Sequence, residues 1–275
     1  MAIETGIAWT DSTFNPWIGC TKVGPGCDGC YAAVLDSRYR LGGDAHWGSG
    51  VPRHRTSEAN WRKPIQWNKE AERSGKRHLV FCASMGDVFD NEVPQQWRDD
   101  FFALIRQTPS LIWQLVTKRV GNAKAMLPAD WGDGYPNVWL ISTVVNQTEA
   151  DRDIPKLLAV PANVHGVSYE PALGPVDWTP LFARGLSWVI IGGESAQSGH
   201  VTRPFDLAWA RSTISQCRKA GAFAFMKQVG SRHSLGKKLR DRAGKDPTEW
   251  PEDLRVQDYP PANIAHDRVK HAAVH

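Results

Sequence analysis

Three cysteines lie in one short segment of the chain, at Cys20, Cys27 and Cys30, with the spacing C-x6-C-x2-C. A Gly-Pro-Gly turn at 24–26 separates the first two. Three thiolates brought together in this way can hold a metal ion or an iron–sulfur cluster and leave one coordination position open. No fourth cysteine follows at short range. The spacing therefore predicts a metal site that is open for chemistry rather than a closed structural site.

Short apolar runs separated by helical patterns predict the elements that position this segment. Strands are expected at 78–83, 111–117, 138–143, 164–168, 188–191 and 222–226, with a short first strand at 14–17 before the cysteines. Helices are expected at 31–41, 94–107, 148–158 and 206–220. Apolar strands alternating with helices are typical of a parallel sheet buried on both faces. The pattern predicts an α/β fold, a full or partial parallel (β/α) barrel of the TIM type, over residues 1–230.

Two segments fall outside this alternation. Residues 42–60 are rich in Gly, His and Arg and are expected to form a lid or an insertion. From residue 231 onward charge and proline content rise and the apolar periodicity stops. We expect 231–275 to be a C-terminal extension that wraps the barrel, with a mobile end.

Polar residues follow almost every predicted strand. In a parallel barrel the loops after the carboxyl ends of the strands form one mouth, and the cysteine segment is the first of these loops. Carboxylates and cations together at such a mouth suit a zwitterionic ligand. The candidates are Ser84, Met85, Gly86, Asp87, Lys118, Arg119, Ser142, Asn146, Glu170, Glu194 and Lys227. Gly192 and Gly193 are expected to let the backbone approach a ligand closely.

The remaining composition narrows the class of protein. Cys82 and Cys217 fall inside a strand and a helix and are expected to be buried, with Cys82 also open as a fourth ligand. The 13 tryptophans are interpreted as core residues rather than base-stacking platforms. No apolar run reaches the roughly 20 residues of a membrane span, and the N-terminus does not resemble a signal peptide. We expect a cytoplasmic protein without a membrane partner. A net charge of +4 permits contact with nucleic acid.

The three cysteines on the first loop of a predicted partial barrel resemble the radical S-adenosylmethionine superfamily. The resemblance implies a 4Fe–4S cluster on Cys20, Cys27 and Cys30, whose open iron binds S-adenosylmethionine. It also implies an electron donor and a 5′-deoxyadenosyl radical that abstracts hydrogen from a substrate. More closely, the chain is similar to the phage-associated three-Cys-motif proteins, phage gene products thirty-seven and sixty-eight. The matching stretches are 13–20, 25–32, 84–87, 167–174, 188–195 and 225–228.

The superfamily likeness also implies roles for individual residues. The superfamily motif has three residues in its first gap and an aromatic before its last cysteine, whereas here the gap is six and Gly29 takes that place. Its Gly-Gly-Glu segment occurs here only at 192–194, so the ammonium of the cofactor is assigned to Ser84, Met85, Gly86 and Asp87. The implied contacts are Lys118 or Arg119 for the carboxylate and Ser142 or Asn146 for the ribose. Glu170, Glu194 and Lys227 would be catalytic residues that face the substrate or the adenosyl group. The phage link suggests a nucleotide or a nucleic acid as the substrate.

A second hypothesis treats the protein as a non-enzymatic zinc or iron–sulfur module that binds nucleic acid. His46, His54 or Cys82 would then complete the site as the fourth ligand. The basic residues Arg53, His54, Arg55, Arg62 and Lys63, together with the segment 237–242, would contact phosphates.

Overall fold

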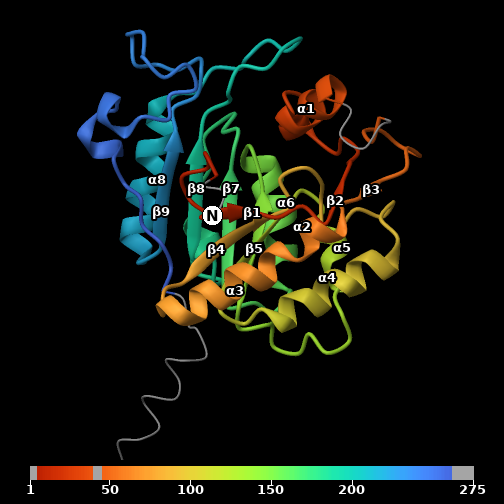
Figure 1. Ribbon diagram of the computed structural model, residues 1–275. Helices are drawn as coiled ribbons and strands as arrows, with labels where there is room; N and C mark the ends of the chain where they lie inside the picture. The colour runs from red at the N-terminus through yellow and green to blue at the C-terminus, as the bar shows by residue number, and fades with distance from the viewer. Residues whose placement is uncertain (1–4, 40–44, 262–275) are drawn as a thin grey trace, which may run out of the picture.

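The computed structural model describes residues 5–39 and 45–261. Seven parallel strands form one sheet in which the spatial order equals the order along the chain (Figure 1). They are β1 Ser12–Thr13, β4 His78–Cys82, β5 Leu111–Thr117, β6 Val138–Thr143, β7 Val164–Tyr169, β8 Trp188–Gly192 and β9 Phe223–Gln228. The sheet curls into a half-barrel, so the predicted fold class is confirmed as a partial parallel (β/α) barrel.

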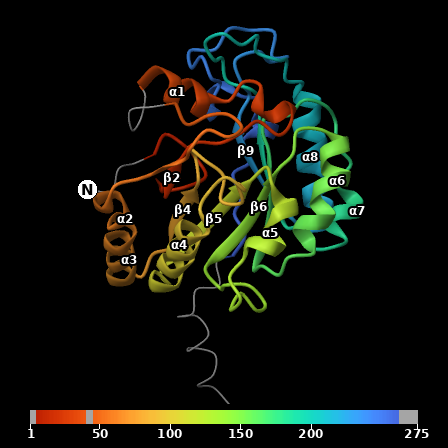
Figure 2. The ribbon, with the colours of Figure 1, turned by 90° about the vertical axis from the view of Figure 1, so that its right-hand side faces the viewer.

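Helices cover the convex face of this sheet. They are α2 Glu58–Trp61, α3 Lys63–Ser74, α4 Gln95–Gln107, α5 Val120–Met126, α6 Gln147–Leu158, α7 Thr179–Phe182 and α8 Leu207–Ala220. Apolar residues such as Phe101, Ile154 and Ile214 pack on outward-facing strand residues and form the larger core. Helix α1, Tyr31–Tyr39, lies instead over one end of the strands, at the top of Figure 2.

A second core fills the concave face of the half-barrel. Trp9, Trp139, Trp188 and Phe225 pack there with other inward-facing strand residues. Ten of the 13 tryptophans are buried, namely Trp9, Trp17, Trp61, Trp67, Trp113, Trp131, Trp139, Trp178, Trp188 and Trp250. This distribution confirms their interpretation as core residues, because a base-stacking platform needs an accessible ring.

The start of the chain differs from its prediction. The expected first strand at 14–17 is divided: β1, Ser12–Thr13, pairs with β4, whereas β2, Trp17–Ile18, pairs antiparallel with β3, His54–Arg55. The segment 42–60 is therefore partly an insertion that returns to the cysteine loop through β3. Residues 40–44, which include the end of the predicted helix at 31–41, lie outside the described part of the chain.

The C-terminal extension packs on the barrel. It carries two short 3-10 helices, Pro247–Glu249 and Glu252–Leu254, and Leu254 is fully buried. Met226 N donates to Val256 O and Asp258 N donates to Ala224 O, so the extension runs along β9. Residues 262–275, for which we expected mobility, lie outside the described range. No helix among the described residues has the length and apolar character required to cross a membrane.

Candidate functional site

A cavity of about 430 Å³ lies where the strands end. Its wall contains all three clustered cysteines and most of the residues predicted for the mouth of the barrel. Those that line it are Cys20, Cys27, Cys30, Ser84, Gly86, Asp87, Lys118, Arg119, Glu170, Glu194 and Lys227. Tyr31, the first residue of α1, donates from its hydroxyl to Ser84 O at 2.9 Å, just beyond β4. The cysteine loop and α1 thus form one side of this cavity.

Three predicted residues do not line the cavity. Ser142 is buried in β6 on the side that faces the helices, because side chains alternate along a strand and its neighbour Thr143 faces the cavity. Asn146 caps α6 by accepting from Glu149 N at 3.0 Å. Met85 lines a separate cavity beside His54 and Trp67. Ser142 and Asn146, which were expected at the ribose, thus lie outside this cavity, whereas Thr143 and Ser168 line it.

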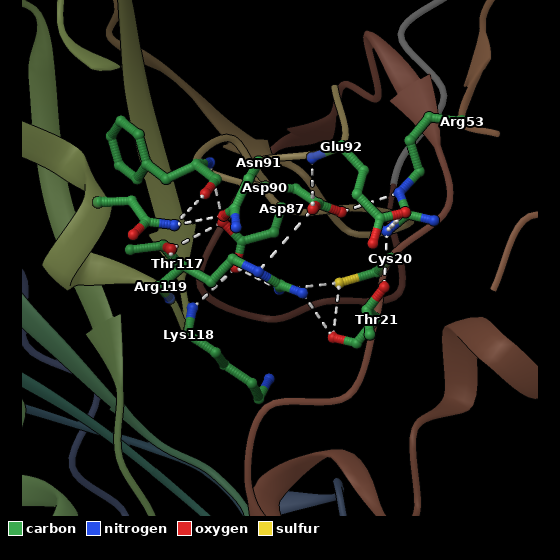
Figure 3. A network of polar contacts seen from close by, with 12 residues as sticks. Cys20, Thr21, Arg53, Asp87, Asp90, Asn91, Glu92, Thr117, Lys118 and Arg119 are labelled. Carbon is green, nitrogen blue, oxygen red and sulfur yellow. Dashed lines mark hydrogen bonds and ion pairs between the residues drawn. The ribbon is translucent and has the colours of Figure 1, made fainter. Parts of the chain in front are cut away.

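Arg119 is in direct contact with Cys20 of the cysteine loop (Figure 3). Its Nη1 donates to Cys20 Sγ at 3.2 Å and its Nη2 donates to Thr21 O at 2.6 Å. Asp87 Oδ2 lies 3.7 Å from the same guanidinium and Asp90 Oδ1 lies 4.0 Å from it. Burial, reinforced by the charges of Asp87 and Asp90, raises the pKa of the Cys20 thiol to about 12, although Arg119 opposes this effect.

The carboxylate of Asp87 is occupied by the protein itself. It accepts from Thr117 Oγ1 at 2.7 Å, from Lys118 N at 2.9 Å and from Phe89 N at 3.0 Å. These bonds hold the turn after β4 against the end of β5. Asp87 lines the cavity as predicted, but its oxygens position the wall and are not free for a ligand.

Glu194 is likewise engaged within the protein. Its oxygens accept from Arg203 N at 2.8 Å and from the Arg203 guanidinium, and His200 Nε2 lies 3.0 Å from Oε2. Burial alone would raise the pKa of Glu194, but the hydrogen bonds from Arg203 and His200 lower it. Arg203 Nη1 also donates to Pro25 O at 2.8 Å, so the pair ties the loop after β8 to the cysteine loop.

Glu170 and Lys227 form an ion pair inside the cavity. They follow β7 and lie in β9, on the alternating positions that face inward, and both side chains are mostly buried. Both residues were expected to face the substrate, and their position in the cavity wall agrees with that expectation. The pair is electrically neutral as a unit.

The structural roles of several basic residues in this region were not predicted from the sequence. Arg53, which the second hypothesis assigned to phosphate contacts, has a fully buried side chain that donates to Asp90 Oδ2 at 2.9 Å and to Thr21 Oγ1 at 2.7 Å. Arg55 stacks on Trp61 and pairs with Asp100. The guanidinium groups of both residues are therefore engaged in contacts within the protein. Nothing local marks them, because their partners lie far away along the chain.

The donor set of the cysteine loop fits a three-thiolate metal or cluster site by its chemistry. Cys20, Cys27 and Cys30 are free thiols on one cavity wall, and no described side chain bonds to the second or third. A Cβ at Gly29, between Cys27 and Cys30, would lie 2.7 Å from Glu194 Oε1, so a larger residue there would displace the Glu194 side chain. In the described residues no three His, Cys, Asp or Glu side chains stand at metal-binding distance of one another.

The candidates for a fourth protein ligand lie elsewhere. Cys82 is fully buried in β4 with the helix-side core, and burial together with Asp87 raises its pKa well above the ordinary value. His46 is bonded through Nδ1 to Asp36 Oδ1 at 2.9 Å, and His54 lines the separate cavity. Neither imidazole lines the wall with the cysteines. None of the three fourth ligands that the sequence suggested lines the cavity with the cysteines.

Comparisons with known proteins agree with this fold. Residues 4–254 match the family model described as "Protein of unknown function (DUF5131)". Two solved structures of spore photoproduct lyase mutants are similar to the chain at 10% identity, each match covering 82% of this chain and 78% of that one, with TM-scores of 0.51 and 0.50. The first, a double mutant, has bound AdoMet and dinucleoside spore photoproduct. No curated protein matches the chain. The family description carries no phage association, so that part of the resemblance stays a prediction.

Proposed function

The chain belongs to the DUF5131 family of proteins of unknown function, and from its site we propose that it is a radical S-adenosylmethionine-type enzyme. The observation that carries the proposal is the placement of three free thiols on the wall of one cavity, at the carboxyl ends of a parallel half-barrel. The half-barrel similarity to spore photoproduct lyase, one structure of which has bound AdoMet, supports it. Cys20, Cys27 and Cys30 would hold a 4Fe–4S cluster, which with an external electron donor would supply one-electron chemistry for cleavage of the cofactor sulfonium.

The residues of the chain would divide the remaining work. Lys118 lines the cavity, and its ammonium makes no ion pair with any described residue, so it is the group left to bind the carboxylate of the cofactor. Ser84 and Gly86 present backbone to the same wall and would hold the amino group. Thr143 and Ser168 take the place proposed for the ribose contacts. Glu170 and Lys227 would meet the substrate across the cavity.

Anaerobic reconstitution with iron and sulfide tests this function. The wild-type protein is expected to take up about four irons per chain and, after reduction, to convert S-adenosylmethionine to 5′-deoxyadenosine. The triple variant C20A/C27A/C30A should do neither. C217A is the matched control, because Cys217 is buried in α8 outside the cavity and its loss should leave iron content unchanged. Stoichiometric tetrahedral zinc without 5′-deoxyadenosine would instead support the non-enzymatic alternative.

A nucleotide or nucleic-acid substrate is the finer part of the proposal. The acids of the cavity are neutralised internally, since Asp87, Glu170 and Glu194 each pair with a cation. Lys22, Lys118 and Lys245 line the same cavity without an ion pair to any described residue. A mouth with uncompensated positive charge favours an anionic ligand. The dinucleoside photoproduct bound by spore photoproduct lyase is consistent with this substrate class.

Binding measurements across salt concentrations test the substrate class. Single-stranded and duplex DNA, RNA and mononucleotides would be compared by fluorescence anisotropy from about 50 to 200 mM salt. For single strands, K22Q/K118Q/K245Q should flatten the dependence of log K on log salt by about 0.7 per lost phosphate contact. The control K69Q/K124Q/K219Q removes the same charge from exposed helical positions and should keep the wild-type slope. Equal slopes in both variants would contradict the assignment.

A further inference from the structure

Arg119 was expected at the carboxylate of the cofactor, yet its guanidinium is already engaged with the cysteine loop. We propose that Arg119 is a positioning residue that holds the Cys20 sulfur and makes this corner of the thiol triad electrostatically different from the other two. This inference rests on the proposed function, because it concerns a cysteine that would bind the cluster. It assigns to Arg119 a role in the redox behaviour of that cluster and leaves Lys118 to meet the cofactor.

The geometry of the contact is two-pronged. One guanidinium nitrogen donates to Cys20 Sγ at 3.2 Å, and the other donates to the next carbonyl, Thr21 O, at 2.6 Å. The planar fork of arginine therefore fixes both the sulfur and the backbone that carries it. A lysine has one charged nitrogen and cannot make both bonds with the same geometry.

A buried charge network fixes Arg119 in turn (Figure 3). Its side chain is only 8% exposed and lies between Asp87 and Asp90. Asp90 is bound on its other side by Arg53, whose side chain is fully buried and also donates to Thr21 Oγ1. Thr21 is thus held by two arginines from opposite directions. Arg119 and Arg53 face Asp87 and Asp90, and Arg53 also pairs with the partly exposed Glu92, so each charge of the network has a partner of opposite sign.

The three cysteines are unequal as a result. Cys20 accepts a hydrogen bond from a cation, whereas no side chain in the described part of the chain bonds to the sulfur of Cys27 or Cys30. Hydrogen bonds and positive charge beside a cluster sulfur stabilise the reduced, more negative state and raise the reduction potential. Arg119 would therefore raise the potential of the bound cluster and slow the loss of iron at Cys20.

The test compares the anaerobically reconstituted wild-type protein with R119Q, R119K and K124Q. The midpoint potential is measured by a titration followed by electron paramagnetic resonance, and iron release is measured with a chelator. R119Q should have a lower potential than wild type and lose iron faster, consistent with the roughly 10- to 100-fold loss of affinity typical of such partners. R119K should keep a potential nearer wild type, because it retains the charge, but should still release iron faster than wild type.

K124Q is the matched control, because it removes a positive charge from an exposed position of α5, outside the cavity, and breaks no contact to the cysteine loop. It should change both measurements less than R119Q does. If R119Q does not fold, as judged by circular dichroism of the metal-free protein, faster iron release from R119K supports the inference and wild-type release contradicts it. A wild-type protein that binds no cluster overturns the proposed function. A wild type that binds the cluster, with R119Q and R119K indistinguishable from it, overturns the role of Arg119 alone.

Discussion

Glu194 is a predicted catalytic carboxylate that instead holds other residues in position. Its acceptors are filled by Arg203 and His200, and Arg203 extends the contact to Pro25 O in the cysteine loop. The loop that carries the thiols is thus fixed at one end by Arg119 and at the other by Arg203. A carboxylate whose two oxygens both accept hydrogen bonds from an arginine, with its pKa lowered, is poorly suited to take a proton from a substrate.

At this scale we predict that E194Q destabilises the protein in a pH-dependent manner. The pKa of Glu194 is lowered below its ordinary 4.5 in the folded protein, so its ionised form contributes stability above that pH. The free energy of unfolding of E194Q should be lower than that of wild type at pH 7. The difference should narrow as the pH falls below 4.5, because the unfolded chain then binds a proton, and it should be lost as the pH falls through the lower pKa of Glu194 in the folded protein. Urea unfolding at both pH values measures this.

E72Q is the control for that measurement, because Glu72 is exposed on α3. It should differ little from wild type at either pH. A difference between E194Q and wild type that stays constant with pH would contradict the argument.

At the scale of elements, the close approach of the ends of strands β8 and β9 depends on a glycine. From the sequence, Gly192 and Gly193 were expected to let the backbone approach a ligand closely. A Cβ on Gly193 would instead lie 2.4 Å from Val229 O, so the space is filled by the backbone that follows β9. A Cβ on Gly192 would lie 3.2 Å from the Glu170 side chain, which is flexible at that end. A Cβ at Gly192 can be accommodated by a shift of the Glu170 side chain, whereas a Cβ at Gly193 requires the backbone to move.

We therefore predict different effects for two neighbouring substitutions. G193A should lower the free energy of unfolding by about 1–3 kcal/mol or more, because the backbone of one strand end must move. G192A should cost clearly less, because Glu170 can shift. Denaturant titration of both variants gives the comparison. Equal destabilisation would show that the contact with Val229 does not limit this position.

At the scale of the molecule, the half-barrel is open between β1 and β9, and the chain ends cover this gap. Tyr259 packs against Trp188 and Phe225, and its hydroxyl donates to Ala8 O at 3.2 Å. Trp188 Nε1 donates to Asp258 O at 3.0 Å. The extension thus joins the N-terminal segment over the concave core. Its role in the described structure is to bury apolar surface that a closed barrel would bury by itself.

Trp250 tests how tightly the extension packs on the larger, helix-side core. Its side chain is 2% exposed, and its indole nitrogen donates to Gly244 O at 2.9 Å. W250A should lower the free energy of unfolding by about 3–5 kcal/mol, as is typical of a buried large aromatic residue. V201A, at a position that is 80% exposed, should change it by less than about 0.5 kcal/mol. A small effect of W250A would mean that the extension packs loosely in solution.

Local pattern alone determined much of this protein. Strands β4 to β9 lie within a residue or two of the apolar runs that predicted them, because burial on both faces produces continuous apolar segments. The parallel order places their carboxyl ends together, so the meeting of the cysteine loop with Asp87, Lys118, Glu170, Glu194 and Lys227 followed from topology. The division of the first strand did not follow, since two-residue pairings leave almost no periodic signal.

Only the tertiary structure decided what each polar side chain does. Ser142 and Thr143 are adjacent and chemically alike, and the pleat of β6 alone directs the second into the cavity. Arg119 meets Cys20 across 99 positions of sequence, and Arg203 meets Pro25 across 178. Charge partners at such separations are chosen by how the elements pack, which a single sequence does not encode locally. The three cysteines indicated an open metal site, and the packed charges around them decide which residues remain free to use it.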